Sequence, residues 1–215
     1  MPLISWIHDH LTRRKMERLF ARGEDPYRYR TSSYEQARFQ KTVEVLRDRR
    51  FHRILEVGCG EGVLSRDLVQ RTDVLVALDI SAAALERARV QLDPWKQRVQ
   101  FVQGNIRKWI QDCGHHSFDL IVLSEVLYYL GEKEQKGTFL EFSFLDFLKD
   151  VSERLGPEGW ILLAHGFCNP RERKIREGYG QRLAHQGLRL KGEWVAGEFE
   201  HDKGSARCLI QLFSK

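Results

Sequence analysis

A glycine-rich loop and an acidic residue downstream of it form the pattern with the clearest chemistry in this 215-residue chain. The loop reads Glu56-Val-Gly58-Cys-Gly60-Glu-Gly62 and lies between a predicted strand and a predicted helix. Glycines let the backbone turn tightly, and its N–H groups and the start of the next helix can bind polar or anionic groups. Asp79 stands 21 residues after Gly58, at the end of the next predicted strand, where a carboxylate can accept hydrogen bonds from both ribose hydroxyls. This pattern indicates a nucleoside-binding site.

Glu56 at the start of the loop and Val63 directly after it indicate which kind of nucleoside the loop binds. The dinucleotide fingerprint GxGxxG needs a third glycine at position 63, but the chain has Val63 there. Glu56 would repel a pyrophosphate, and it suits a ligand that carries an ammonium or sulfonium group. The alternative is a purely local role for Glu56, as a cap or an ion-pair partner. The loop therefore favours a cationic nucleoside over a dinucleotide.

Short apolar runs alternate with helical ones from residue 54 onward, and this order of elements must position the loop. The predicted strands are 54–57, 74–78, 99–102, 118–123 and 160–164, and the predicted helices are 63–71, 82–92, 139–155 and 170–186. Gly156-Pro-Glu-Gly159 is predicted to be a turn that leads into the fifth strand. Strands that are separated by helices pair in parallel, with helices on both faces of the sheet.

The pattern changes after the last of these helices. Residues 188–199 and 206–213 are typical of two strands joined by a turn at Asp202-Lys-Gly204, which predicts a terminal antiparallel hairpin. The predicted fold class is therefore α/β: a Rossmann-like doubly wound sheet, mostly parallel, with a C-terminal antiparallel hairpin strand and helices on both faces. We predict one compact domain, with a helical lid or flank at residues 1–53 and the α/β domain at residues 54–215.

Composition excludes several classes of protein. The chain is 42% hydrophobic, so it can bury a core, and it has no apolar run of about 18 residues that would predict a membrane span. Its four cysteines are scattered without a CxxC pair, which favours a cytoplasmic protein over a disulfide-stapled secreted domain or a zinc knuckle. The net charge of +5 is uneven, since residues 1–53 hold 13 Lys and Arg against 7 Asp and Glu. That basic segment either meets an anionic partner or is a solvated helix face.

The loop, the acidic residue and the terminal hairpin together resemble the class I S-adenosylmethionine-dependent methyltransferases over residues 25–215. This resemblance implies S-adenosyl-L-methionine as the cofactor, S-adenosyl-L-homocysteine as its product, and methyl transfer by in-line displacement. Asn105 stands where the family usually has an Asp that meets the adenine amino group. Matched motif by motif, the implied cofactor-binding residues are Glu56, Gly58, Gly60, Asp79, Ile80, Ser81, Asn105, Ile106 and Ser124.

The leading segment resembles more narrowly the nodulation protein S subfamily. Asp25-Pro-Tyr-Arg-Tyr29 and Ser33-Tyr-Glu-Gln-Ala-Arg38 carry this resemblance, and Tyr128-Tyr129 agrees with it. Those bacterial enzymes N-methylate the amino group of a deacetylated chitooligosaccharide, and proteins with similar motifs act on other small molecules. The resemblance implies that Tyr34 and Arg38 contact the methionine end of the cofactor, beside a wall of tyrosines. The alternative is that these tyrosines only pack under an edge of the sheet.

Methyl transfer to an amine requires a neutral nitrogen, so a proton acceptor is expected near the acceptor atom. Glu125 and His165 each follow a predicted strand, at the end of an open parallel sheet where ligands bind. Tyr128 is expected to orient the acceptor or to stack on a sugar ring. The alternatives are that Glu125 caps a helix and that His165 is a hydrogen-bonded rim residue. We predict no metal site, because the adjacent His115 and His116 lack further ligands.

The favoured function is therefore methyl transfer to an amine nitrogen of a small molecule or amino sugar. The alternatives are an RNA or other nucleic-acid methyltransferase that uses the basic leading segment, and a small-molecule O-methyltransferase. Ser124-Glu-Val-Leu stands where enzymes that methylate amino groups of DNA bases carry Asp/Asn-Pro-Pro-Tyr/Phe. A dinucleotide-dependent oxidoreductase is disfavoured by Val63, and a non-catalytic binding protein is disfavoured by the intact loop. Nothing in the sequence indicates the oligomeric state.

Overall fold

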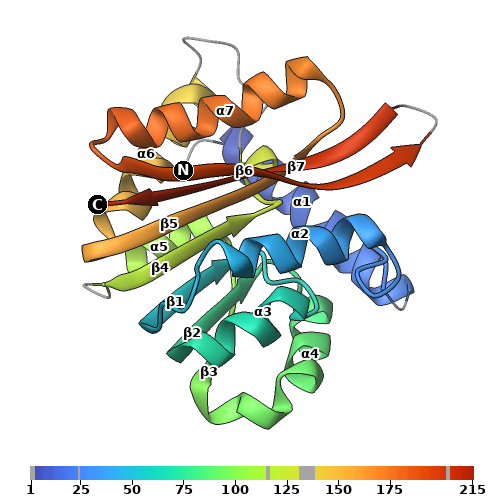
Figure 1. The fold of residues 1–215 in the computed structure, drawn as a ribbon. Helices are drawn as coiled ribbons and strands as arrows, with labels where there is room; N and C mark the ends of the chain where they lie inside the picture. Colours follow the sequence, from blue (N-terminus) through green and yellow to red (C-terminus); the bar gives the residue numbers. More distant parts are fainter. Residues whose placement is uncertain (1–2, 24, 115–116, 131–138, 202–203) are drawn as a thin grey trace.

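A mixed β-sheet forms the centre of the protein (Figure 1). The computed structural model describes residues 3–23, 25–114, 117–130, 139–201 and 204–215. Within these residues the strands follow the order β3-β2-β1-β4-β5-β7-β6 across one seven-stranded sheet. The first five strands in this order pair in parallel, and β7 runs antiparallel between β5 and β6. The strands are β1 (Phe51–Val57), β2 (Thr72–Asp79), β3 (Val99–Gln103), β4 (Phe118–Ser124), β5 (Leu155–Phe167), β6 (Arg189–His201) and β7 (Gly204–Ser214).

Helices cover both faces of this sheet. The helices are α1 (Leu3–Arg22), α2 (Ser33–Glu44), α3 (Val63–Leu68), α4 (Ala82–Gln91), α5 (Ile106–Asp112), α6 (Phe139–Glu153) and α7 (Pro170–His185). Short 3₁₀ turns follow α3, α4 and β4, at Val69–Arg71, Asp93–Arg98 and Leu127–Tyr129. One apolar core lies between the sheet and α2, α3 and α4, and a second core lies between the sheet and α5, α6 and α7. Burial on both faces explains why β2 and β4 contain continuous apolar runs, at Leu75–Leu78 and Leu120–Leu123.

The ends of the helices are fixed by short polar side chains. Ser81 caps α4 by accepting a hydrogen bond from the N–H of Ala84, and Asn169 caps α7, which begins with a proline. Both arrangements satisfy N–H groups that have no partner inside the helix. Because α4 begins directly after β2, this cap also fixes the chain at the end of that strand.

The predicted fold class is confirmed, including the terminal hairpin, in which β6 pairs antiparallel with β7. One local prediction is wrong, and one helix was not predicted. Gly156–Gly159 is not a turn, because β5 already begins at Leu155 and this segment is an irregularity in its pairing with β4. The helix α5 was not expected, because seven residues are too few to show a helical period. The predicted turn at Asp202–Gly204 includes residues outside the described part of the chain.

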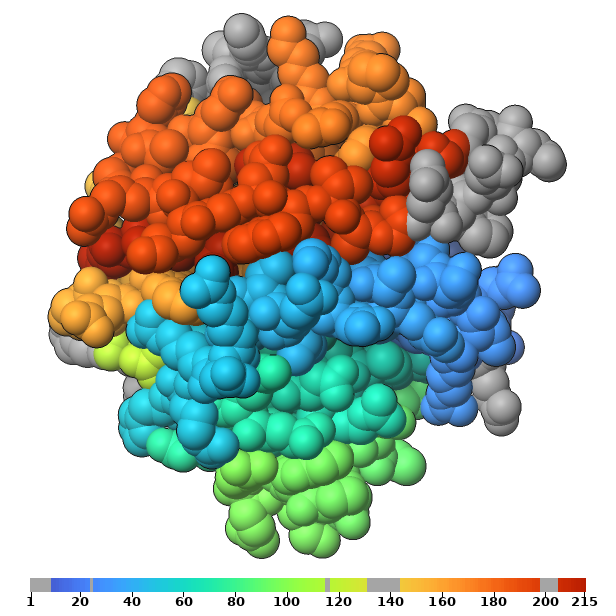
Figure 2. All heavy atoms as spheres, viewed as in Figure 1, coloured from blue at the N-terminus to red at the C-terminus, as the bar shows by residue number. Residues whose placement is uncertain are grey.

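The segment before β1 holds two helices that lie against different parts of the α/β core. Helix α1 packs on α4, and α2 lies along β6 and beside α3. Figure 2 shows α2 in blue between the red strand β6 and the teal helix α3. This placement brings α2 over the hairpin side of the sheet. Among the described residues, no helix has both the length and the apolar character needed to cross a membrane.

Candidate active site

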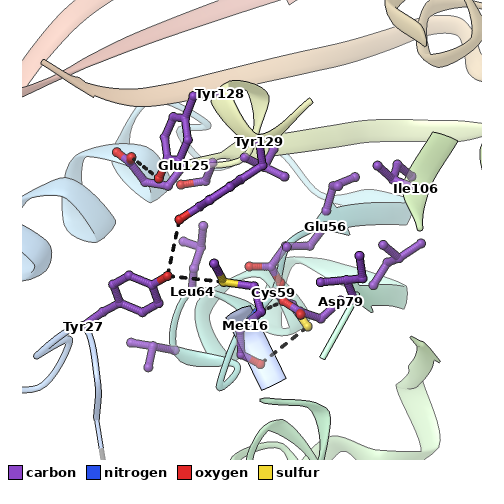
Figure 3. A pocket seen from close by; sticks show the side chains of 18 of the residues that line it. Met16, Tyr27, Glu56, Cys59, Leu64, Asp79, Ile106, Glu125, Tyr128 and Tyr129 are labelled. Carbon is purple, nitrogen blue, oxygen red and sulfur yellow. Dashed lines mark hydrogen bonds between the residues drawn. The ribbon is translucent and has the colours of Figure 1, made fainter. Parts of the chain in front are cut away.

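A cavity of about 280 Å³ opens where the parallel strands β1, β2 and β4 end. The strand order reverses between β1 and β4, and this switch point is where open α/β sheets bind ligands. Figure 3 shows Asp79 and Ile106 toward one end of the cavity and Glu125 with Tyr128 toward the other. All of the predicted cofactor-binding residues line this cavity except Ser81, which adjoins it. The structure therefore brings together residues that are up to 90 positions apart, from Tyr34 to Ser124.

The glycine loop holds the carboxylate of Asp79 in place through backbone amides. The N–H of Gly60 donates to Oδ2 of Asp79 at 2.9 Å, and the N–H of Ser81 donates to Oδ1 at 2.8 Å. Gly60 has a φ of +54°, in the left-handed region that favours glycine, and this turn aims its N–H at Asp79. Burial raises the pKa of Asp79, while these backbone N–H groups lower it. The backbone N–H of Ile80 also hydrogen-bonds this carboxylate, so three backbone amides hold it on the cavity wall.

Glu56 is a buried acid on the floor of the same cavity. It is 2% exposed, and the hydroxyl of Ser65 donates to its Oε2 at 2.5 Å. Burial raises the pKa of Glu56 to about 8, and the Ser65 hydrogen bond only partly offsets this effect. The side chain is therefore mostly neutral at pH 7, and a cation bound beside it would favour its ionised form.

Asn105 and Ile106 mark the start of α5 and lie beside Asp79 on the cavity wall. The side-chain Oδ1 of Asn105 accepts a hydrogen bond from the N–H of Arg107 at 2.8 Å and so caps the helix. The N–H of Gly104 donates to the backbone carbonyl of Asp79 at 3.0 Å, which ties this corner to β2. The amide of Asn105 keeps its two N–H donors and one oxygen lone pair for other partners.

Glu125 occupies the end of the cavity that lies beyond β4. Its Oε1 accepts the N–H of Gly166 at 2.7 Å, and its Oε2 accepts the hydroxyl of Tyr128 at 3.1 Å. Its own N–H donates to the carbonyl of Ala164 at 2.9 Å, and its φ is +53°. A left-handed backbone at a residue other than glycine costs about 1–3 kcal/mol and persists only where neighbours hold it. Three hydrogen bonds hold this one, so Glu125 is fixed in its unusual conformation.

Arg38 links α2 to the end of β4 from inside the protein. It is 2% exposed, its Nη1 donates to Oγ of Ser124 at 2.6 Å, and its Nε donates to Oε2 of Glu35 at 3.0 Å. A buried guanidinium that is paired in this way is held rigidly, because losing either partner would leave a charge without compensation. Both Arg38 and Ser124 line the cavity next to Glu125.

Tyrosines surround the end of the cavity that holds Glu125. Five of the six tyrosines in the chain line it. The hydroxyls of Tyr27 and Tyr129 lie 3.5 Å apart. A dashed line marks this contact in Figure 3. The rings of Tyr128 and Tyr129 have centroids 4.5 Å apart. Burial raises the pKa of Tyr128, and the nearby Glu125 carboxylate raises it further, so its hydroxyl stays neutral and can donate.

Residues 9–149 match the family of Nodulation protein S (NodS). This match covers well over half of the chain. The chain belongs to the NodS family of class I S-adenosylmethionine-dependent methyltransferases. The predicted family is therefore confirmed.

Individual relatives of this NodS-family chain match it in part. It is 34% identical to Nodulation protein S of Bradyrhizobium diazoefficiens over 108 residues, which are 50% of each chain. It is 37% identical to a tRNA1(Val) (adenine(37)-N6)-methyltransferase of Cronobacter sakazakii over 166 residues, 69% of this chain and 64% of that one. The match thus spans about half the length of the first relative. The crystal structure of N-methyltransferase NodS from Bradyrhizobium japonicum WM9, in complex with S-adenosyl-L-homocysteine, has the same fold, with a TM-score of 0.78 at 22% identity, over 95% of this chain and 98% of that one.

His165 does not reach the cavity of this NodS-family protein. It is 2% exposed, and its Nε2 accepts the backbone N–H of Leu127 at 3.2 Å. Its ring packs at 5.3 Å from that of Tyr179 on α7, and burial lowers its pKa well below the usual value. These contacts match the interpretation of His165 as a hydrogen-bonded structural residue.

Helix α1 contributes residues that sequence reasoning did not single out. Glu17 accepts hydrogen bonds from the hydroxyl of Ser81 and the N–H of Ala82, both at 2.9 Å. It thereby fixes α1 to the start of α4, directly beside Asp79. The same helix supplies a lining face whose 3- and 4-residue spacing is helical, and this face consists of Asp9, Thr12, Met16 and Phe20.

Metal chemistry finds no support in the described part of the chain. There, no three His, Cys, Asp or Glu side chains lie together in a way that could hold a metal ion. The adjacent His115 and His116 lie outside the described residues.

Proposed function

We propose that this chain transfers a methyl group from S-adenosylmethionine to an amine nitrogen of a small molecule. One observation carries the proposal: a single cavity joins the glycine loop and Asp79 to a fixed carboxylate, Glu125, that tyrosines surround. The first half suits a nucleoside, and the second half suits a cationic or basic nitrogen. A dinucleotide would need to extend past Glu56, whose carboxyl would meet its pyrophosphate.

The residues at the Asp79 end fit the cofactor. The carboxylate of Asp79, which backbone amides hold in place, would accept hydrogen bonds from the two ribose hydroxyls. Asn105 and Ile106 would receive the adenine, and Glu56 would lie near the charged portion of the cofactor. When bound, S-adenosylmethionine supplies an activated methyl group on a sulfonium. The enzyme then mainly has to align the acceptor and exclude water.

The Glu125 end supplies what an amine acceptor needs. An ammonium has no lone pair, so it must lose a proton before its nitrogen can react. A carboxylate oxygen of Glu125 would accept the N–H hydrogen bond and take this proton, so that the amine becomes neutral and the carboxyl becomes protonated. Aromatic faces attract ammonium groups, so the tyrosines would hold the acceptor before it loses its proton and would hold the methylated ammonium that forms on transfer. The hydroxyls of Tyr27 and Tyr129 lie 3.5 Å apart at this end of the cavity, which brings both rings to the acceptor.

Two observations distinguish this proposal from methylation of a nucleic acid. The residues after β4 are Ser124 and Glu125, in place of the Asp/Asn-Pro-Pro-Tyr/Phe that enzymes acting on amino groups of DNA bases carry. The Glu125 carboxylate is also held at two oxygens and is negatively charged when ionised, so it suits a cation more than a neutral base. An alcohol acceptor is neutral, so the faces of the tyrosine rings would attract it less strongly than they attract an ammonium group.

The test is methyl transfer to matched acceptors. The protein is incubated with S-adenosylmethionine and a deacetylated chitooligosaccharide, its N-acetylated counterpart, or an unmodified tRNA transcript, and products are followed by mass spectrometry. We expect one or more methyl groups on the amine of the deacetylated compound alone. A methyl group on the acetylated sugar would indicate O-methylation, and a methyl group on the tRNA would replace the proposal with the nucleic-acid alternative.

A further inference from the structure

The side chain of Tyr34, from α2, packs closely against two glycines of the sheet, Gly197 and Gly166. A Cβ added to Gly197 of β6 would lie 2.9 Å from Cδ2 of Tyr34 and 3.2 Å from its carbonyl oxygen. A Cβ added to Gly166 of β5 would lie 2.7 Å from the hydroxyl of Tyr34. Contacts below 3.0 Å do not occur in real structures without a shift of the neighbouring atoms. The ring of Tyr34 therefore lies against Gly197, and its hydroxyl lies against Gly166.

The pairing of the strands places these two glycines in line. Gly166 of β5 pairs with Cys208 of β7, and Cys208 pairs with Ala196 of β6, which directly precedes Gly197. The residues that lie side by side here on β5, β7 and β6 all have a small side chain or none. Tyr34 packs on the apolar core that includes Ala196 and Cys208. We call this seat of Gly166, Cys208 and Gly197 the Tyr34 slot.

Gly197 has the backbone of a β-bulge. Its φ is +66°, and the register of β6 against β7 shifts between Ala196 and Phe199. Bulges bend a strand and redirect its neighbours, and they are common next to active sites. At this bulge the backbone of Gly197 faces the ring of Tyr34, and no side chain lies between them. The special conformation and the close approach both require glycine at this position.

The hydroxyl of Tyr34 ends at the candidate acceptor site. A Cβ on Gly166 would also lie 3.2 Å from Oε1 of Glu125, the oxygen that accepts the N–H of Gly166. The Tyr34 hydroxyl and this oxygen thus approach Gly166 from the same side. Burial raises the pKa of Tyr34, and the Glu125 carboxylate raises it further, so the phenol stays neutral and keeps a donor and two acceptor lone pairs.

We propose that Gly166 and Gly197 are positioning residues, which seat Tyr34 so that its hydroxyl stands beside Glu125 and orients the acceptor amine. This inference rests on the proposed function, because it assigns a part of the same site. It moves Tyr34 from the methionine end of the cofactor, where the family resemblance places it, to the acceptor. The substitutions that test it therefore separate acceptor turnover from cofactor affinity.

The first test compares Gly197→Ala with Gly187→Ala. Gly187 has a φ of +90° and nothing within 4 Å of an added Cβ, so its alanine variant meets the same type of backbone strain without a contact. We expect Gly197→Ala to lower kcat/KM for the deacetylated chitooligosaccharide by about 10- to 100-fold, since a misplaced group costs this much. The affinity for S-adenosylhomocysteine, measured by calorimetry, stays at the wild-type value, and Gly187→Ala changes neither quantity. Equal kinetics in the two variants, or a parallel loss of cofactor affinity, would overturn the proposal.

Tyr34→Phe tests the hydroxyl separately. It keeps the ring in the slot and removes the group that faces Glu125, so it reproduces the kinetic loss of Gly197→Ala without displacing the ring. A wild-type kcat/KM in Tyr34→Phe would show that the hydroxyl has no part in orienting the acceptor.

A double-mutant cycle tests the slot without any acceptor. Urea unfolding is measured for the wild type, Gly197→Ala, Tyr34→Ala and the double variant. If the ring fills the slot, Gly197→Ala lowers the urea midpoint by less in the Tyr34→Ala background than in the wild type. Equal shifts in both backgrounds would show that there is no slot. This outcome is independent of methyl transfer, so failure of the proposed function and failure of the slot are distinguished.

Discussion

The two ends of the cavity are built in different ways. At the proposed cofactor end, backbone N–H groups of Gly60 and Ser81 hold Asp79, and all three lie within the continuous segment from β1 through α3 and β2 to α4. At the proposed acceptor end, Glu125 is held by Tyr128 and by Gly166 from another strand, and Tyr34 approaches from α2. The first end depends on the course of the backbone, whereas the second depends on side chains that come from distant segments.

This difference suggests how the protein can keep one cofactor while its acceptor changes. Backbone amides at strand ends are fixed by the sheet, so we expect the cofactor end to tolerate substitutions elsewhere. We expect the acceptor end to change with substitutions in α2, β5 or β6, because these elements supply its contacts. We therefore expect substitutions at the two ends to have separable effects, on cofactor affinity at one end and on turnover at the other.

The largest expected effect is that of Glu125→Gln. The amide cannot take a proton from the acceptor, so kcat should fall by about 10²- to 10⁴-fold, which is the usual contribution of a general base. The affinity for S-adenosylhomocysteine should remain at the wild-type value in calorimetry. The exposed Glu158, at the start of β5 and far from the cavity, provides the control Glu158→Gln. Unchanged turnover in Glu125→Gln would remove this residue from the mechanism.

Asp79→Ala should affect the other end. It removes two hydrogen bonds from ribose hydroxyls to a charged acceptor, each worth about 1.5–3 kcal/mol, so the Kd for S-adenosylhomocysteine should rise by at least about tenfold. At saturating cofactor, kcat should change little. Asp73→Ala is the control, because Asp73 lies at the opposite end of the same strand and is exposed. If calorimetry gives the same Kd for Asp79→Ala and the wild type, the assignment of the ribose is wrong.

Glu56 should make stability depend on pH. Its folded-state pKa of about 8 lies above the ordinary value of 4.5 because of burial, so the unfolded chain ionises at a lower pH than the folded one. Raising the pH from about 4.5 to 8 therefore favours unfolding, by up to about 1.4 kcal/mol per pH unit. Glu56→Gln should flatten this decline in urea unfolding at successive pH values. Equal slopes in both proteins would show that Glu56 is ionised at neutral pH.

Glu17→Ala should have the smallest effect of the four substitutions predicted here. Its carboxylate caps α4 from α1, and losing a helix cap costs about 1 kcal/mol. We expect the free energy of unfolding to fall by this amount and the affinity for S-adenosylhomocysteine to fall less than in Asp79→Ala. Arg18→Ala, at the next and exposed position of α1, is the control. A loss of affinity as large as that of Asp79→Ala would mean that α1 itself holds the cofactor.

The cofactor end was accessible from sequence because its geometry is local. The spacing from Gly58 to Asp79 equals the length of one helix and one strand, and the apolar pattern of both elements is clear. The alternation of strands and helices likewise predicted the sheet. The Gly-Pro-Glu-Gly segment at 156–159 misled because its composition is typical of a turn, while the chain there keeps pairing with β4 from Leu155 onward.

The acceptor end was less accessible because side-chain direction and tertiary contact determine it. His165 was expected at the rim, but β5 continues to Phe167, so His165 still alternates within the strand and faces α7. Glu17 and Gly197 carry no local motif, since their roles come from contacts with Ser81 and Tyr34. Only the structure brings these pairs together.

The most direct test of the central claim is thermal unfolding of the wild-type protein with S-adenosylhomocysteine or NADH. A ligand at 100 times its Kd adds about 2.7 kcal/mol to stability. For a chain of this size, we therefore expect Tm to rise by roughly 5–11 °C with S-adenosylhomocysteine and to stay constant with NADH. A rise with NADH, or none with S-adenosylhomocysteine, would contradict the assignment of the glycine loop and Asp79 to this cofactor.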